Sequence, residues 1–111
     1  MNLSNRQFEL IENSTGHASA KTIMQFSERI EPFLGIYSGP NTIHGQVIVR
    51  TSQTGATKML YQSVTSDGEL VAGQAEVTLH EEVDQPTTMQ LNWQWLTGSR
   101  ISGISIWREI K

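Results

Sequence analysis

The stretch from Thr87 to Ile110, TTMQLNWQWLTGSRISGISIWREI, decides the fold class of this chain. Its first half places Met89, Leu91, Trp93 and Trp95 at every second position, with polar residues between them. An apolar residue at every second position is typical of a β-strand with one buried face. The stretch is therefore expected to begin with a half-buried strand.

A second strand is expected after Gly98-Ser99, where the apolar residues alternate again. A glycine at the first position of a two-residue loop is typical of a type II′ turn. Counting outward from that turn pairs Trp93 with Ile104. It also pairs Met89 with Arg108, so that both apolar sets lie on one face. The sequence thus predicts a β-hairpin in this register.

The chain from Phe33 onward reads as six short strands separated by turn signals, of which Asp67-Gly68 is the strongest hairpin dipeptide. Strands joined by short loops pair antiparallel, because parallel neighbours need long crossovers. Twist accumulates over six strands and favours closure toward a barrel. The small residues Gly73 and Ala75 indicate a bend or a close approach by another group. The strands before the hairpin are expected at Phe33–Ser38, His44–Ser52, Thr57–Thr65 and Glu69–Glu81.

Residues 1–32 predict helices instead. Ser4-Asn5-Arg6-Gln7 matches a capping box, and a short helix is expected from about Asn5 to Asn13. A second helix is expected from near Ser19 to Ile30, where apolar residues recur at helical spacing. The predicted fold is therefore a single α+β domain, mainly β, with a strongly curved, barrel-like six-stranded antiparallel meander over residues 33–111.

The composition excludes several classes of protein. The 111 residues suffice for one domain, and the net charge of −3 leaves no basic footprint for nucleic acid. The chain has no cysteine, which excludes disulfides and cysteine-ligated metals. No apolar run has membrane-spanning length, and the first ten residues lack the pattern of a signal peptide. We expect a cytoplasmic domain that inserts into no membrane and holds no metal or cofactor.

Gly35-Ile36-Tyr37 in the first predicted strand, taken with Arg108 in the last, resembles the signature of the calycins, the superfamily of lipocalins and fatty-acid-binding proteins. In that superfamily the first barrel strand carries Gly-x-Trp, and an Arg or Lys from the last strand packs across the Trp ring. Here Tyr37 stands in place of the Trp, and six strands are read where calycins have eight or ten. The resemblance implies a cup-shaped barrel that binds small lipophilic molecules, with Tyr37 and Arg108 in contact.

The candidate ligand-binding residues are Arg108, Trp93, Trp95, Tyr37 and Met89. Arg108 falls among apolar residues and needs a partner, because an unpaired buried charge is very costly. It would anchor a carboxylate or phosphate inside a cavity, or it reaches the rim and stacks on Tyr37. Trp93 and Trp95 would line a pocket by stacking, or they simply fill the core.

The sequence assigns no catalytic residue. His80 stands beside Glu81 and Glu82 at a strand end, where it is either acid–base machinery or an exposed, solvated side chain. Neither His17 nor His44 lies at a ligand spacing from another histidine, so a local metal motif is absent. There is also no phosphate loop, dinucleotide fingerprint or nucleophile elbow, and the balance favours a non-enzymatic protein.

Three functions stay open. The first is a small-molecule binding domain, with a cavity on the concave sheet face that takes a small apolar or carboxylate-bearing ligand. The second is an oligomerisation or protein-interaction module, because Ile48, Met59, Tyr61 and Trp107 fall on the outer face in this count. The third is a small cone-shaped α+β enzyme on an apolar substrate, which rests on fold analogy. The outer cluster also leads us to expect a homodimer through the face that bears Trp107.

Overall fold

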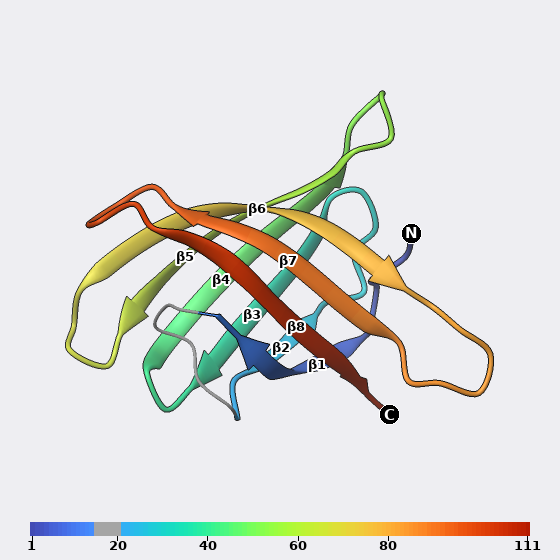
Figure 1. The fold of residues 1–111 in the computed structure, drawn as a ribbon, viewed down its shortest axis with the longest axis horizontal. Helices are drawn as coiled ribbons and strands as arrows, with labels where there is room; N and C mark the ends of the chain where they lie inside the picture. Colours follow the sequence, from blue (N-terminus) through green and yellow to red (C-terminus); the bar gives the residue numbers. More distant parts are fainter. Residues whose placement is uncertain (15–20) are drawn as a thin grey trace.

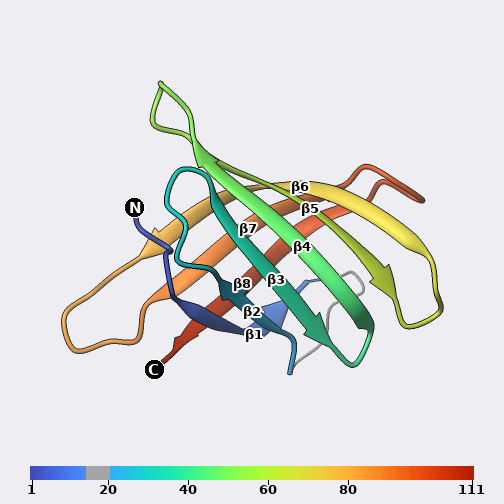
Figure 2. The ribbon, with the colours of Figure 1, turned by 180° about the vertical axis from the view of Figure 1, so that it is seen from behind.

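The computed structural model describes residues 1–14 and 21–111, and this part of the chain contains β-strands and no helix. Each strand pairs antiparallel with the next, and β1 pairs with β8, so that the sheet closes into an eight-stranded barrel (Figures 1 and 2). The predicted α+β fold with a six-stranded meander is therefore wrong, although the six strands expected after Phe33 lie where β3 to β8 are found. The strands are β1 Gln7–Asn13, β2 Ile23–Phe26, β3 Phe33–Gly39, β4 Thr42–Thr51, β5 Thr57–Thr65, β6 Leu70–His80, β7 Thr88–Trp95 and β8 Ser102–Ile110.

The N-terminal segment forms strands because its buried side chains alternate. Phe8 and Leu10 of β1 face the barrel interior, as do Met24 and Phe26 of β2, whereas Ile11 is 40% exposed. A two-residue period belongs to a strand, and a helix would have buried Ile11 with Phe8.

Both predicted helices are wrong over the described residues. The expected capping box is a turn instead, in which the Arg6 amide donates to the Leu3 carbonyl at 3.1 Å. Residues 15–20, which include His17 and the start of the second predicted helix, lie outside the described residues.

The β7–β8 hairpin has a longer turn than the sequence predicts. The Trp95 amide donates to the Ile101 carbonyl at 2.9 Å, and the intervening loop places both Gly98 and Arg100 at positive φ. Trp93 consequently pairs with Gly103. A one-residue change of register turns every side chain of a strand to the other face. The predicted type II′ hairpin register is therefore wrong.

The register of β8 decides which of its side chains are inside. Ser105 and Trp107 are each 4% exposed, whereas Ile104 is 48% exposed and Arg108 also faces outward. Trp107 thus belongs to the interior and cannot carry an intersubunit contact.

The face assignment of β5 is also reversed relative to the sequence prediction. Val49 of β4 pairs with Met59, and both are buried, while Tyr61 faces the same side two residues further on. The residue between them, Leu60, is 57% exposed. Of the expected outer cluster, only Ile48 lies on the outer surface.

Large apolar side chains fill the end of the barrel at which the chain starts and finishes. Phe8 and Phe26 pack edge to face there, with ring centroids 6.2 Å apart. Leu3, Phe33 and Met89 are almost completely buried. This end is therefore solid core, and free space remains toward the opposite end of the barrel.

Candidate ligand-binding site

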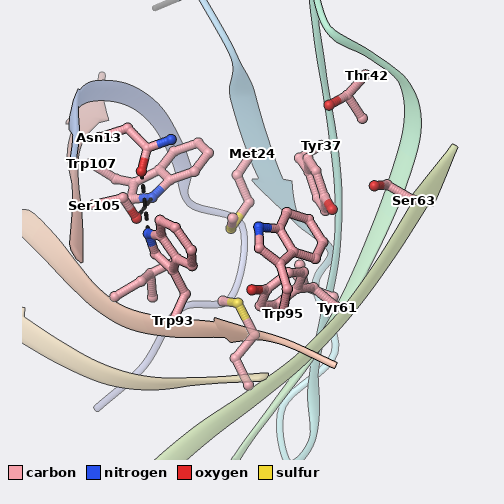
Figure 3. Close-up of a pocket in the computed structure, with 13 residues that line it drawn as sticks. Asn13, Met24, Tyr37, Thr42, Tyr61, Ser63, Trp93, Trp95, Ser105 and Trp107 are labelled. Atoms are coloured by element: carbon pink, nitrogen blue, oxygen red, sulfur yellow. Dashed lines mark hydrogen bonds between the residues drawn. The ribbon is translucent and has the colours of Figure 1, made fainter. Parts of the chain in front are cut away.

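A cavity of about 60 Å³ lies in the barrel interior (Figure 3). Among the described residues that line it, none carries a charge. Five are aromatic and four are neutral polar residues, and aliphatic or thioether side chains complete the wall. The aromatic residues are Tyr37, Tyr61, Trp93, Trp95 and Trp107; the polar ones are Asn13, Thr42, Ser63 and Ser105; the apolar ones are Met24, Val47, Met59 and Leu91.

One side of the cavity is built by two indole rings with internal hydrogen bonds. Trp93 Nε1 donates to Asn13 Oδ1 at 3.2 Å, which the closure of β1 onto β8 makes possible. Trp107 Nε1 donates to Ser105 Oγ at 3.0 Å within β8. A buried indole N–H normally has such a partner. These bonds fix both rings, and they leave the Ser105 hydroxyl hydrogen to be donated elsewhere.

The other side is an aromatic group that includes Tyr37, Tyr61 and Trp95 (Figure 3). Tyr61 meets Trp95 edge to face, with ring centroids 5.1 Å apart, and Trp93 lies 6.4 Å from Trp95. Met24 stands between the two groups (Figure 3). Aromatic faces on several sides suit a ligand ring better than a flexible polar chain.

Burial widens the pH range over which both tyrosine hydroxyls stay protonated. It raises the pKa of Tyr37 above its usual value, and interaction with the Ser63 side chain offsets part of that rise. Burial also raises the pKa of Tyr61, and the neighbouring Tyr37 adds to the effect. At neutral pH both groups are therefore uncharged and can donate hydrogen bonds.

Three of the five predicted ligand-binding residues line the cavity: Trp93, Trp95 and Tyr37. Met89 is fully buried in the core and does not line it. Arg108 lies outside the barrel. Its Nη2 is 2.6 Å from Glu9 Oε1, across the seam where these two residues pair between β1 and β8.

The predicted contact of Tyr37 with Arg108 is wrong, because the first faces the interior and the second faces solvent. Arg108 contributes an exposed ion pair at the closing seam, with its side chain 48% exposed. The physical reason is the β8 register, which turns Trp107 inward in its place.

Sequence reasoning missed several lining residues. Asn13 fell in a predicted helix, and Ser105 and Trp107 fell on the wrong face of β8. The alternation of Gly103, Ser105 and Trp107 is the signal that could have identified this inner face, since two small residues leave room for large rings opposite them.

The remaining candidates lie away from the cavity. His44 and His80 are exposed on the outer surface. In the described part of the chain, no group of three or more His, Cys, Asp or Glu side chains is placed to hold a metal ion. The described residues also include no helix that is long and apolar enough to cross a membrane.

A closed antiparallel barrel of eight strands with an aromatic-lined interior defines a barrel of the calycin type. The sequence model of the avidin-like protein family matches residues 1–110, and the chain therefore belongs to this family. No match was found among curated proteins or among solved structures. The expected calycin resemblance is thus right for the superfamily, while the residue pairing on which it rested is not found.

Proposed function

We propose that this protein binds a small molecule in the barrel cavity, through contacts with the aromatic walls and hydrogen bonds to neutral polar groups. The observation that carries this proposal is the lining itself, which combines five aromatic rings with hydroxyl and amide groups. Proteins of the avidin-like family bind small ligands such as biotin, and the membership of this chain in that family supports the proposal.

The part of the ligand inside the barrel is uncharged. A carboxylate there would have no cationic partner among the described lining residues, and burying an unpaired charge is very costly. The cavity of about 60 Å³ is small beside the roughly 300–1,000 Å³ of pockets that enclose a whole drug-sized ligand. The ligand therefore places a narrow ring with neutral hydrogen-bonding groups inside and extends through the mouth, where a carboxylate stays in solvent.

Titration with biotin tests this proposal, and the tryptophans supply the signal. All three tryptophans of the chain line the cavity, so their fluorescence reports on its occupancy. We expect saturable binding, with biotin methyl ester within about tenfold of biotin because the carboxylate stays outside. Native mass spectrometry of the purified protein detects any ligand carried through purification. The proposal is contradicted if biotin gives no heat of binding in calorimetry and no change of tryptophan fluorescence, and if mass spectrometry detects no ligand retained through purification.

We also propose that the outer face of β3, β4, β5 and β6 pairs with a second copy of this chain. Leu34 pairs with Ile48, and Ile48 with Leu60, so that three aliphatic side chains, 37%, 49% and 57% exposed, lie in a row. Exposed apolar rows of this kind are typical of protein interfaces. This face replaces the Trp107 face as the expected dimer surface.

Charges beside this row favour a second copy as its partner. Arg50 and Lys58 pair across β4 and β5, and Lys58 pairs in turn with Glu76 of β6. Within residues 1–14 and 21–111, none of the three forms an ion pair. A two-fold axis along β5 places β4 of one copy opposite β6 of the other, and so brings Arg50 opposite Glu76 on both sides of the axis. The two Lys58 side chains meet at the axis, and their repulsion offsets part of this attraction.

Sedimentation velocity checks this proposal at a protein concentration of roughly tens of micromolar. At that concentration, a dimer with a dissociation constant of ~1 μM is mostly formed. We expect a dimer for the native protein and a monomer for Leu60→Glu. Leu70→Glu is the matched control, because Leu70 is 80% exposed outside this row. Arg50→Glu should weaken the dimer, and Arg50→Glu combined with Glu76→Arg should restore it. A native monomer, or a dimer that Leu60→Glu leaves intact, would overturn the assignment.

A further inference from the structure

Three of the aromatic rings that line the cavity lie across glycines of the neighbouring strand. In each case the aromatic residue and the glycine are direct cross-strand partners. A Cβ built on any of these glycines would lie less than 3.0 Å from atoms of the opposite ring. The pairs are Tyr37 with Gly45, Tyr61 with Gly73, and Trp93 with Gly103.

This arrangement determines how far each ring projects. Real Cβ atoms essentially never approach other heavy atoms so closely, so a ring facing alanine would have to move. Behind the ring is the backbone of the barrel wall, and the free direction is toward the cavity. Glycine in the interior of a strand is otherwise unfavourable, which makes close approach the physical reason for its presence.

We propose that Gly45, Gly73 and Gly103 are positioning residues that set the width of the cavity and thereby select the ligand. None of them lines the cavity, and each acts through the ring that covers it. The selected ligand carries a narrow ring between the aromatic walls, and bulkier groups are excluded. The selection of a ligand rests on the proposed function, whereas the positions of the rings rest on the glycine contacts.

Gly73 offers a clean test, because the three atoms nearest to an added Cβ all belong to Tyr61. Tyr61 also touches Trp95 edge to face, and its hydroxyl donates to the Gln94 carbonyl at 3.4 Å. A displaced Tyr61 ring therefore moves against Trp95 and narrows the space. Gly103 is less suitable, since its added Cβ would also meet Ser14 Oγ.

The test is a double-mutant cycle of Gly73→Ala and Tyr61→Ala, with biotin as the probe. We expect Gly73→Ala alone to weaken biotin binding by about tenfold or more, while the same change in the Tyr61→Ala background alters binding by less than about twofold, because no ring remains to be displaced. An equal loss in both backgrounds, or no loss in either, would overturn the proposal. A role of Gly73 that does not act through the Tyr61 ring would give the same loss in both backgrounds.

A second readout separates this inference from the proposed function. Acrylamide quenching of tryptophan fluorescence needs no ligand, and it should change on Gly73→Ala in the native background and stay constant in the Tyr61→Ala background. If biotin fails to bind and the quenching pattern holds, the biotin proposal fails and the glycine mechanism stands. If the quenching does not change, the glycine mechanism fails. Should Gly73→Ala not fold, Gly45→Ala in native and Tyr37→Ala backgrounds must give the same pattern.

Discussion

Replacing Trp107 with alanine is expected to lower the free energy of unfolding by about 3–5 kcal/mol, the usual cost of removing a large aromatic side chain from a core. Trp107 is 4% exposed, and its indole N–H is bonded to Ser105 inside the barrel. The change removes this packing, opens the cavity toward the core and leaves Ser105 without its donor. Urea unfolding followed by circular dichroism measures the effect.

The adjacent residue provides the matched control. Arg108→Ala removes only an exposed ion pair with Glu9 at the β1–β8 seam, and such pairs contribute about 0–1 kcal/mol. The two variants therefore distinguish the two possible registers of β8. If Arg108→Ala proved strongly destabilising and Trp107→Ala nearly neutral, the face of β8 would be the one that the sequence predicted, and the cavity described above would be lost.

The strands after Phe33 could be predicted from sequence, because alternation and turn dipeptides are local signals. The two N-terminal strands could not, since each offers only two buried apolar residues to establish a period, Phe8 and Leu10 in one and Met24 and Phe26 in the other. Their strand conformation is fixed by tertiary pairing: β1 and β2 fill the gap between β3 and β8 and so remove the open sheet edges. A local sequence pattern does not indicate this long-range closure.

The register of the last hairpin illustrates a different limit. Gly98-Ser99 is compatible with a two-residue turn, and nothing in the sequence indicates that Arg100 adopts a positive φ of 57°. Positive φ is uncommon for a residue other than glycine. The loop over residues 96–100, in which Gly98 and Arg100 both have positive φ, is longer than the predicted turn and places Gly103, not Ile104, opposite Trp93.

The candidate site was accessible from sequence only in part. Trp93 and Trp95 were identified because they fall on the inner side of a clearly alternating strand, and Tyr37 was identified through the calycin-like Gly35-Ile36-Tyr37 motif. Asn13 required the barrel to close before it could meet Trp93. Gly73 and Ala75 were expected to mark a bend or a close approach, and at Gly73 the structure shows a close approach by the Tyr61 ring. The identity of that group depends on the β5–β6 register.

The largest loss of ligand binding is expected for Trp95→Ala. Trp95 lies between Trp93 and Tyr61, so its removal takes away the ring that connects the two sides of the cavity. Buried aromatic residues at the centre of a binding site commonly contribute about 2 kcal/mol or more, which corresponds to roughly a thirtyfold loss of affinity. Because Trp95 is only partly buried, the stability of the barrel should fall less than in Trp107→Ala.

Isothermal titration calorimetry with biotin measures this loss of affinity. Gln90→Ala on the same strand is the control. Gln90 faces the opposite side of β7, where its side chain donates to Asn92, so its removal should leave affinity within about twofold. Trp95→Phe retains a ring and should recover part of the affinity, because stacking depends on the aromatic face. Equal affinities for Trp95→Ala and Gln90→Ala would place the ligand elsewhere on the molecule.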